Sequence, residues 1–456
     1  MNEGNGKKAA FHNLGCKVNS YETEAMQQQL EQAGYEIVPF APGADVYVIN
    51  TCSVTNIADR KSRQMLHKAK KMNPSAIIVA AGCYVQTAKE RTGLEVEADI
   101  VLGNNKKIDL LEVLKRYEKA SKIAGDQQNT QQELIDINHT KEYELLSITK
   151  TEEHTRAYIK VQDGCNQFCS YCIIPYARGR ARSREPKEVV EELRKLSASG
   201  VKEVVLTGIH LSSYGKDLDS SLLELMESVH ELEGIERIRL GSLEPGIVTE
   251  EFSSRLASLS KICPHFHLSL QSGCDEVLKR MNRRYDTAEY RERCEILRSY
   301  FDMPALTTDV IVGFPGETDT EFLETVEFLK SIRFYETHVF KYSKRKGTRA
   351  AEMPDQIPET VKSDRSNVLI KLNRKNKKAY EEAWLGKDCE VLYEEKVVLD
   401  GQDYYVGYTR EYIKAAILAT DNFENRILRG RLCCKSGFDL PVLQMKNECL
   451  AWKVLD

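Results

Sequence analysis

Three cysteines lie close together in one polar segment, CNQFCSYC, at positions Cys165, Cys169 and Cys172. The segment follows an apolar run, AYIKVQDG, that has the length and composition of a strand. Thiols on a polar loop have no packing role, so such a loop favours metal binding. Three thiolates at this spacing can hold an iron–sulfur cluster and leave its fourth iron without a protein ligand. A tetrahedral zinc ion would need a fourth cysteine or histidine nearby, and the local sequence offers none.

Three more cysteines each close an apolar run of strand length. Cys16 ends AAFHNLGC, Cys52 ends DVYVINTC and Cys83 ends AIIVAAGC. Cysteine is a common buried residue, but three cysteines at equivalent strand ends favour a shared role. Parallel strands bring their carboxyl ends to one edge of a sheet, where α/β proteins bind ligands. These strand-end thiols can therefore converge, and they predict a second cluster that again lacks a fourth protein ligand.

Length and composition place these cysteines in a soluble protein of several domains. A chain of 456 residues is too long for one ordinary core and suggests about three domains. No apolar run approaches the roughly 18 residues that a membrane helix needs, and the stretch MNEGNGKKAA lacks the apolar core of a secretory signal. We therefore expect a cytoplasmic protein with no membrane partner. Thirteen cysteines in that reducing compartment favour metal binding or catalysis over disulfides.

Strand-like and helical stretches alternate along two long parts of the chain, which makes the fold class α/β. Residues 7–118 predict an N-terminal parallel sheet domain that carries the strand-end cysteines. Residues 119–150 are polar and weakly patterned, as a linker would be. A second strand–helix series over residues 151–381 predicts a partial or complete parallel barrel with its chemistry at the carboxyl ends of the strands. Residues 360–384 predict one long basic helix, and short alternating strands over residues 384–453 predict a small β-barrel.

Several motifs resemble those of a known family. The spacing C-x-x-x-C-x-x-C resembles the radical S-adenosylmethionine (SAM) superfamily, in which the open iron binds the amino and carboxylate groups of that cofactor. The stretches LGCKVNSYETE, VINTCSVTN, AAGCYVQ and DGCNQFCSYCIIPYARGRARSR resemble the methylthiotransferase family, as do HLSLQSGCDEVLKRMNRRY and TTDVIVGFPGET. The C-terminal barrel resembles a TRAM domain. The resemblance covers nearly the whole chain and implies S-adenosyl-L-methionine and two 4Fe–4S clusters, a radical SAM cluster on the loop cysteines and an auxiliary cluster on the strand-end cysteines.

The resemblance also implies positions that contact S-adenosylmethionine. Tyr171 stands where the superfamily has an aromatic residue against the adenine. Thr207 and Gly208 end a strand near the expected methionine amino group, although a glycine that closes a strand is more often only a turn. The remaining expected contacts are Gln271, Ser272 and Arg283 or Arg284, with Arg284 taken as the site residue.

The activity implied by the resemblance is attachment of a methylthio group to an unactivated carbon, which in the nucleic-acid branch is carbon 2 of an adenine. Such a carbon is neither acidic nor electrophilic enough for ordinary catalysis, so a radical is needed. One electron into the radical SAM cluster would cleave S-adenosylmethionine to a deoxyadenosyl radical that removes the hydrogen. A second S-adenosylmethionine would methylate a sulfur on the auxiliary cluster, and that group joins the carbon. The implied partners are a sulfur source and an electron donor such as a flavodoxin or ferredoxin.

The residues after the first cysteine separate the branches of this family. Lys17, Val18 and Asn19 follow Cys16 and resemble the branch that acts on threonylcarbamoyl-adenosine beside the tRNA anticodon. The isopentenyl-adenosine branch more often has Gln-Met-Asn there, and the branch that modifies a ribosomal-protein aspartate has Pro-Lys-Asn. Modification of isopentenyl-adenosine tRNA or of a ribosomal protein is the alternative. A further alternative is a non-catalytic iron–sulfur protein that binds RNA and senses redox state.

Charge along the chain points to an RNA substrate. Residues 362–378 contain seven basic side chains and one acid, and the stretch FKYSKRKGTR adds five basic residues without an acid. A solvated face would explain one such segment, but two together favour contact with a phosphate backbone. The barrel is slightly acidic, with ten Lys and Arg against twelve Asp and Glu over residues 386–456. The predicted contacts with a tRNA anticodon stem-loop are Lys371, Arg374, Lys375, Lys378, Arg426, Arg429 and Arg431.

Overall fold

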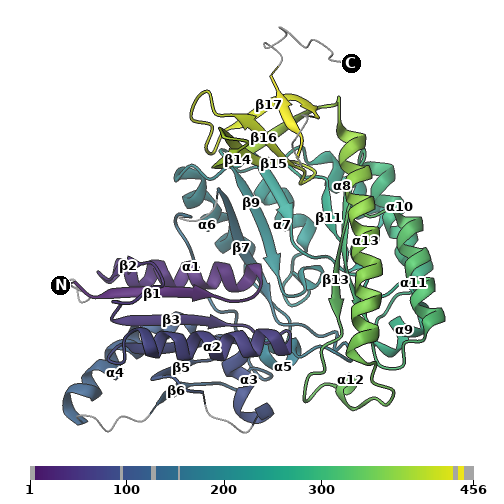
Figure 1. Ribbon diagram of the computed structural model, residues 1–456. Coiled ribbons are helices and arrows are strands. Elements are labelled where there is room, and N and C mark those ends of the chain that lie inside the picture. Colours follow the sequence, from purple (N-terminus) through teal and green to yellow (C-terminus); the bar gives the residue numbers. More distant parts are fainter. Residues whose placement is uncertain (1–5, 93–95, 125–129, 152–154, 435–439, 446–456) are drawn as a thin grey trace.

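A computed structural model describes residues 6–92, 96–124, 130–151, 155–434 and 440–445 (Figure 1). Its N-terminal domain comprises β1 (Lys8–Asn13), α1 (Lys17–Gln32), β2 (Glu36–Val38), β3 (Val46–Thr51), α2 (Asn56–Met72), β4 (Ile77–Gly82), α3 (Cys83–Thr92), β5 (Ile100–Leu102), a 3-10 turn (Lys107–Asp109), α4 (Leu110–Ala124) and β6 (Gln131–Glu133). The six strands form one parallel sheet in the order β2–β1–β3–β4–β5–β6. Helices cover both faces because the strands bury apolar side chains on both sides, with one hydrophobic cluster under α1 and α4 and another under α2 and α3.

Part of the segment that the sequence suggested as a linker belongs to this sheet. Helix α4 continues to Ala124, and β6 pairs with β5 as the sixth strand. The prediction of a linker over residues 119–150 is wrong there, because the backbone of a strand at a sheet edge can pair without an apolar face. Further along, Ile137, Leu146 and Ile148 are buried. The N-terminal domain therefore extends beyond residue 118.

The central domain is a partial barrel of mostly parallel strands with helices outside (Figure 1). Its strands are β7 (Arg156–Asp163), β8 (Arg182–Ser183), β9 (Glu203–Gly208), β10 (Arg237–Leu240), β11 (His265–His267), β12 (Ala305–Val312) and β13 (Glu336–Lys341). They form two sheets, β8–β7–β9–β10 and β11–β12–β13. Two isolated β-bridges, Ile238–Ile262 and Leu243–Leu268, connect the region of β10 to the region of β11 and so join the sheets. The curved sheet stays open between β13 at one edge and β7 and β8 at the other.

Helices between the strands bury the apolar face of this sheet. They are α5 (Ile174–Arg178), α6 (Pro186–Ala198), α7 (Leu222–His230), α8 (Glu250–Ser258), α9 (Asp275–Arg280), α10 (Thr287–Tyr300), α11 (Asp319–Ile332), α12 (Arg349–Glu352) and α13 (Glu359–Trp384), with 3-10 turns at Leu211–Ser213 and Pro245–Ile247. The long helix expected over residues 360–384 is α13. It lies along β13 and leads to the C-terminal domain (Figure 1).

The C-terminal domain is a small closed β-barrel. Its strands are β14 (Asp388–Leu399), β15 (Gln402–Thr409), β16 (Lys414–Leu418), β17 (Ile427–Cys433) and β18 (Val442–Gln444), in the order β14–β15–β16–β18–β17. The stretch YYVGYTREYIKAAI turns at Tyr412 and forms parts of β15 and β16. The last residues of the expected barrel, 446–453, lie outside the described residues.

Arginines at the amino ends of the central strands hold the C-terminal barrel. Arg237 begins β10, and its Nη2 donates to the carbonyl of Glu390 at 2.9 Å. Arg239 donates from Nη1 to the carbonyl of Arg410 at 2.9 Å and from Nε to the buried Glu203 at 2.9 Å. The C-terminal barrel therefore docks at the end of the partial barrel opposite the cysteine loop, which follows the carboxyl end of β7 (Figure 1).

A buried network of charges joins the N-terminal domain to the central domain. Glu22 on α1 lies 2.8 Å from Lys160 Nζ on β7, 2.9 Å from Arg178 Nη1 and 2.9 Å from Lys107 Nζ. All four side chains are inaccessible to solvent. Burial alone would raise the pKa of Glu22, but the three cations hold it well below the ordinary range. The carboxylate is therefore ionised, and the domains are joined by mutually compensating charges.

Replacing Glu22 should loosen this junction. In Glu22→Gln, three buried cations lose a counter-charge, and breaking such a set typically costs about 3–5 kcal/mol. We expect a drop of several degrees in the thermal unfolding midpoint. Because the folded pKa of Glu22 is lowered, its stabilisation is present above the ordinary carboxyl pKa and is lost as the pH falls through the folded value.

The control is Glu31→Gln on the same helix, whose exposed carboxylate lies 3.0 Å from Lys150. An exposed pair of this kind contributes at most about 1 kcal/mol. Equal midpoints for the two variants would show that the buried network does not join the domains.

Candidate active site

The strand-end cysteines lie together at the carboxyl edge of the N-terminal sheet. Cys52 directly follows β3 and Cys83 directly follows β4, whereas Cys16 lies between β1 and α1. Strands β1, β3 and β4 are neighbours in the sheet. Burial first, and then the nearby thiols of Cys83 and Cys16, raise the pKa of Cys52 to about 12. Gly15 allows the close approach, because a Cβ at this position would lie 3.1 Å from Cys52 Sγ. The three thiols therefore share one small region.

This region is closed on one side and open on the other. Cys52 and Cys83 are buried, whereas Cys16 is exposed. Arg178 of the central domain donates from Nε to Cys83 Sγ at 3.2 Å, and Asn104 donates from Nδ2 to the same sulfur at 3.5 Å. The strand-end thiols are thus held from the buried side and accessible from the side of Cys16.

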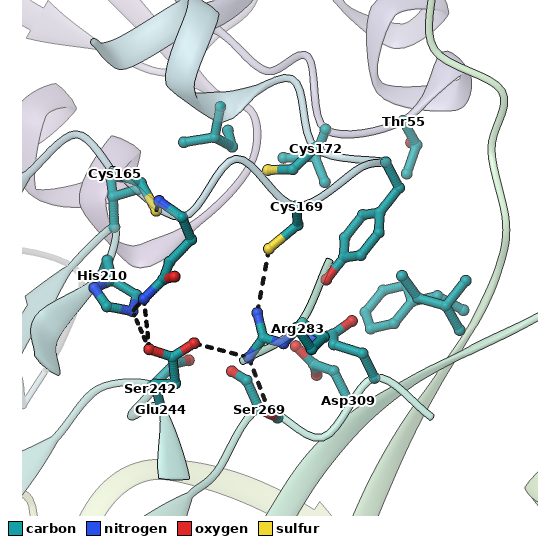
Figure 2. A pocket seen from close by; sticks show the side chains of 18 of the residues that line it. Thr55, Cys165, Cys169, Cys172, His210, Ser242, Glu244, Ser269, Arg283 and Asp309 are labelled. Carbon is teal, nitrogen blue, oxygen red and sulfur yellow. Dashed lines mark hydrogen bonds and ion pairs between the residues drawn. The ribbon is translucent and has the colours of Figure 1, made fainter. Parts of the chain in front are cut away.

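The loop cysteines line a cavity of about 290 Å³ at the carboxyl ends of the central strands (Figure 2). Burial, followed by the neighbouring thiol of Cys169, raises the pKa of Cys172 to about 12. Burial also raises the pKa of Cys165 to about 11, and Cys169 adds to the effect. Thiols with raised pKa values, as at Cys165 and Cys172, become thiolates most readily around a cationic iron centre. With no fourth cysteine among the residues that line the cavity, this donor set fits a 4Fe–4S cluster with one open iron.

Charged side chains face the loop cysteines across the cavity. Arg283 donates from Nη1 to Cys169 Sγ at 3.3 Å and from Nη2 to the carbonyl of Ser269 at 3.3 Å, and it lies 3.4 Å from Glu244. His210 Nε2 lies 3.1 Å from Glu244 (Figure 2). Against the effect of burial, His210 and Arg283 lower the pKa of Glu244 and keep it ionised. Fixed groups of both signs beside the loop fit an amino acid cofactor with ammonium and carboxylate groups.

Some of the residues predicted to contact the cofactor line this cavity. Tyr171 and Gln271 do so, and Gln271 adopts a positive φ of 75°. Of the two arginines considered, Arg283 lines the cavity, whereas Arg284 is exposed and does not. Consecutive residues point in different directions, so the choice of Arg284 is wrong for this cavity.

Three other predicted contacts also lie outside the cavity lining. Ser272 Oγ lies 3.2 Å from Thr325 Oγ1 on α11, so its side chain points toward the outer helices. Thr207 is buried within β9. Gly208 is needed for packing against β7, since a Cβ there would lie 2.8 Å from Gln162 Oε1. Structural roles therefore account for these positions.

Sequence reasoning missed several polar residues of the cavity. His210, Ser242 and Glu244 follow the ends of β9 and β10, and Asp309 is an inward residue of β12. Their positions in the sequence could have identified them, since polar side chains just after the strands of a parallel barrel lie at its active end. Applying the strand-end rule used for the cysteines to β9 and β10 would have found the first three.

Both domains build the wall of the cavity. Val54 and Thr55, just after Cys52, line it together with the loop cysteines. Arg345, after β13, donates from Nη2 to Asp59 at 2.8 Å and to Ser53 Oγ at 2.9 Å. This contact holds the segment after Cys52 over the cavity. Arg345 belongs to a stretch whose charge suggested RNA contact, but its side chain is buried in this clamp.

The basic side chains expected to bind RNA differ in their surroundings. Lys371, Arg374 and Lys375 on α13 are exposed and form no ion pair with the residues that the structure describes, whereas Lys378 lies 3.8 Å from Glu382. Each of the three barrel arginines predicted to bind RNA has an acidic neighbour. The pairs are Arg426–Asp421 at 3.0 Å, Arg429–Glu390 at 3.3 Å and Arg431–Asp388 at 3.1 Å. The exposed face of α13 is therefore the stronger candidate for a phosphate contact.

A partial parallel barrel with three loop thiols at its active end defines a radical SAM enzyme. Accordingly, residues 159–329 match the Radical SAM superfamily, and residues 8–103 match the uncharacterised protein family UPF0004. Threonylcarbamoyladenosine tRNA methylthiotransferase MtaB of Bacillus subtilis (strain 168) is 41% identical over 433 residues, which cover 94% of each chain. MtaB of Aquifex aeolicus (strain VF5) is 40% identical over 87% of this chain and 95% of its own. The chain belongs to the radical SAM methylthiotransferase family, which confirms the resemblance of its motifs.

Other comparisons bear on the fold and the cofactors. A tRNA-2-methylthio-N(6)-dimethylallyladenosine synthase of Caldicellulosiruptor saccharolyticus is 36% identical over 85% of this chain and 83% of its own. The solved radical S-adenosylmethionine methyltransferase TsrM of Kitasatospora setae superposes with a TM-score of 0.55 at 15% identity, over 76% of this chain and 73% of its own, and shares the fold. Membership of the radical SAM superfamily implies S-adenosylmethionine and a 4Fe–4S cluster as cofactors. Among the residues that the structure describes, no helix combines the length and apolar character needed to cross a membrane.

Iron content tests whether both cysteine sets bind clusters. After anaerobic reconstitution with iron and sulfide, we expect about eight irons per wild-type chain, the content of two 4Fe–4S clusters. Alanine at Cys16, Cys52 and Cys83 together should leave about four, with Mössbauer spectra of one remaining cluster. About four irons in both proteins would leave the strand-end cysteines as packing residues. Thermal unfolding of the triple variant checks that the fold is retained.

Proposed function

We propose that this enzyme transfers a methylthio group to carbon 2 of N6-threonylcarbamoyl-adenosine next to the anticodon of tRNA. The observation that carries the proposal is the shared wall, in which Val54 and Thr55, directly after Cys52, line the cavity of Cys165, Cys169 and Cys172. Two sets of iron ligands beside one cavity suit a reaction that both activates a carbon and supplies it with sulfur. The similarity to the two MtaB proteins supports this substrate.

The loop cysteines would hold the radical SAM cluster, which with S-adenosylmethionine supplies the radical needed to remove a hydrogen from an unactivated carbon. Arg283 and Glu244 would bind the carboxylate and ammonium groups of the cofactor through charge-assisted hydrogen bonds. Tyr171 would pack against its adenine, as the aromatic residue of the motif does. The clamp between Arg345 and Asp59 would keep water from the cavity.

The strand-end cysteines would hold the auxiliary cluster, which would supply the sulfur, and Cys16 is the exposed member of the set. Arg178 and Asn104 would orient the Cys83 ligand through their hydrogen bonds to its sulfur. Two further partners complete the reaction. These are a one-electron donor such as a flavodoxin or ferredoxin, and a source for the sulfur that leaves with each product.

The tRNA anticodon stem-loop would lie along the exposed face of α13, with Lys371, Arg374 and Lys375 against its phosphates. Lys378 and the three barrel arginines would add weaker contacts, because each has an acidic neighbour. A cytoplasmic location, where tRNA is modified, stays a prediction. Isopentenyl-adenosine tRNA is the alternative substrate, since a relative named for dimethylallyladenosine is 36% identical.

Two single cysteine variants separate the roles of the clusters. Cys169→Ala should abolish both S-adenosylmethionine cleavage and methylthiolation, because it removes a ligand of the radical SAM cluster. Cys52→Ala should retain cleavage, measured as 5′-deoxyadenosine, and lose the methylthio product, measured by mass spectrometry of nucleosides from tRNA. Equal residual activities in the two variants would refute this division. Product on isopentenyl-adenosine alone would favour the alternative substrate.

Salt dependence tests the RNA-binding face. Alanine at Lys371, Arg374 and Lys375 removes three phosphate contacts, and each contributes about 0.7–0.9 to the slope of log affinity against log salt. We therefore expect the slope for tRNA binding to fall by about 2 to 3. The matched control is alanine at Arg426, Arg429 and Arg431, whose acidic neighbours should make the change smaller. A larger change in the control would place the main contact on the barrel.

A further inference from the structure

The inner face of the partial barrel is polar. A parallel barrel normally fills its interior with Val, Ile and Leu. Here Ala157, Ile159 and Val161 of β7 pack in the hydrophobic cluster under the outer helices. Side chains alternate along a strand, so Tyr158 points inward. By the same alternation, Leu306 and Val310 of β12 face outward and Asp309 inward, where it lines the cofactor cavity.

Two histidines flank Asp309 on the neighbouring strands. His267 Nε2 lies 3.4 Å from Asp309 Oδ2, and its Nδ1 lies 3.1 Å from Thr307 Oγ1. The ring of His338 stacks on that of His267 with centroids 5.8 Å apart. His267 Nε2 is buried, and because its contact with Asp309 lacks hydrogen-bond geometry, it has no hydrogen-bond partner among the described residues. Such groups normally have a partner, so this wall offers hydrogen bonds to a ligand that continues from the cofactor cavity.

Lys17 comes immediately after the exposed Cys16 and lies near Tyr158 of β7. Its side chain is exposed, its ammonium lies 5.8 Å from the centroid of the Tyr158 ring, and it forms no ion pair with any described residue. Burial, Arg239, Lys17 and His267 together lower the pKa of His265. Lys17 and His267 therefore both lie near His265, although they come from different domains. A lysine that forms no ion pair with the described residues thus lies near the polar wall.

We propose that Lys17 binds the carboxylate of the threonylcarbamoyl group and so selects the substrate. This inference rests on the proposed function. In adenine, carbon 2 and the N6 substituent flank N1 on the same edge of the ring. A base whose carbon 2 faces Cys16 therefore directs its N6 substituent toward the same neighbourhood, where Lys17 is the next residue. An ammonium–carboxylate hydrogen bond is among the stronger polar contacts, and an isopentenyl group cannot form it.

Anticodon stem-loop RNAs that differ only in the target nucleoside test this role. The holoenzyme without reductant or added S-adenosylmethionine, in which no reaction proceeds, binds a threonylcarbamoyl-adenosine or an unmodified adenosine stem-loop, and fluorescence anisotropy gives both affinities. We expect wild type to prefer the modified RNA by about 10-fold or more, the value of one hydrogen bond to a charged group. Lys17→Met should abolish most of this preference without changing the affinity for unmodified RNA. Lys17→Arg should retain it.

The control is Lys330→Met on α11, which removes an exposed lysine paired with Glu327 outside the barrel. A full preference in Lys17→Met would overturn the role of Lys17. If wild type forms no methylthio product on threonylcarbamoyl-adenosine tRNA, the proposed function fails and this inference fails with it. If wild type forms that product and Lys17→Met still prefers the modified RNA, only the inference about Lys17 fails.

Discussion

Arg178 is the side chain on which the arrangement of both cysteine sets depends. Its Nε donates to Cys83 Sγ at 3.2 Å, and its Nη1 lies 2.9 Å from Glu22 and 3.1 Å from Asp163. Glu22 is on the helix that Cys16 precedes, and Asp163 ends the strand that leads to Cys165. Buried ions tolerate little displacement, because a charge that loses its partner is left without either water or counter-charge. One guanidinium group therefore fixes the position of the two cysteine sets relative to each other.

Strand β7 contacts all three domains along its length, and its carboxyl end belongs to the network around Arg178. At its start, Arg156 lies 2.8 Å from Glu394 of the C-terminal barrel. Tyr158 faces the interior beneath Lys17, and Lys160 and Asp163 join the network around Glu22. The same strand thus contacts the N-terminal domain, the C-terminal barrel and the loop of the radical SAM cluster. Because a strand rises by about 3.3 Å per residue, the order and spacing of these contacts along β7 are fixed.

The sequence was informative where one residue type and one spacing decide the chemistry. Cysteines after β3 and β4 had to converge, since parallel strands bring their carboxyl ends to one edge. Side-chain direction was not accessible in the same way, so Ser272 was predicted beside Gln271 and Arg284 was preferred to Arg283, although only Gln271 and Arg283 line the cavity. The strand at 131–133 was missed because its stability comes from backbone pairing. The clamp of Arg345 and the inward position of Lys17 depend on how domains dock, which no local pattern encodes.

The open side of the partial barrel makes the polar side chains of its interior accessible from outside. A closed barrel would fill its core with side chains, whereas seven strands leave a gap between β13 and β7. Helix α13 lies beside β13, and α1 packs against β7, so these two helices lie at the two edges of the gap. A base in an anticodon loop is unpaired and enters a protein interior at a lower cost than a base in a duplex. In the proposed function, phosphate contacts on α13 would position the RNA without reading it, and the choice of nucleoside would fall to the side chains inside the barrel.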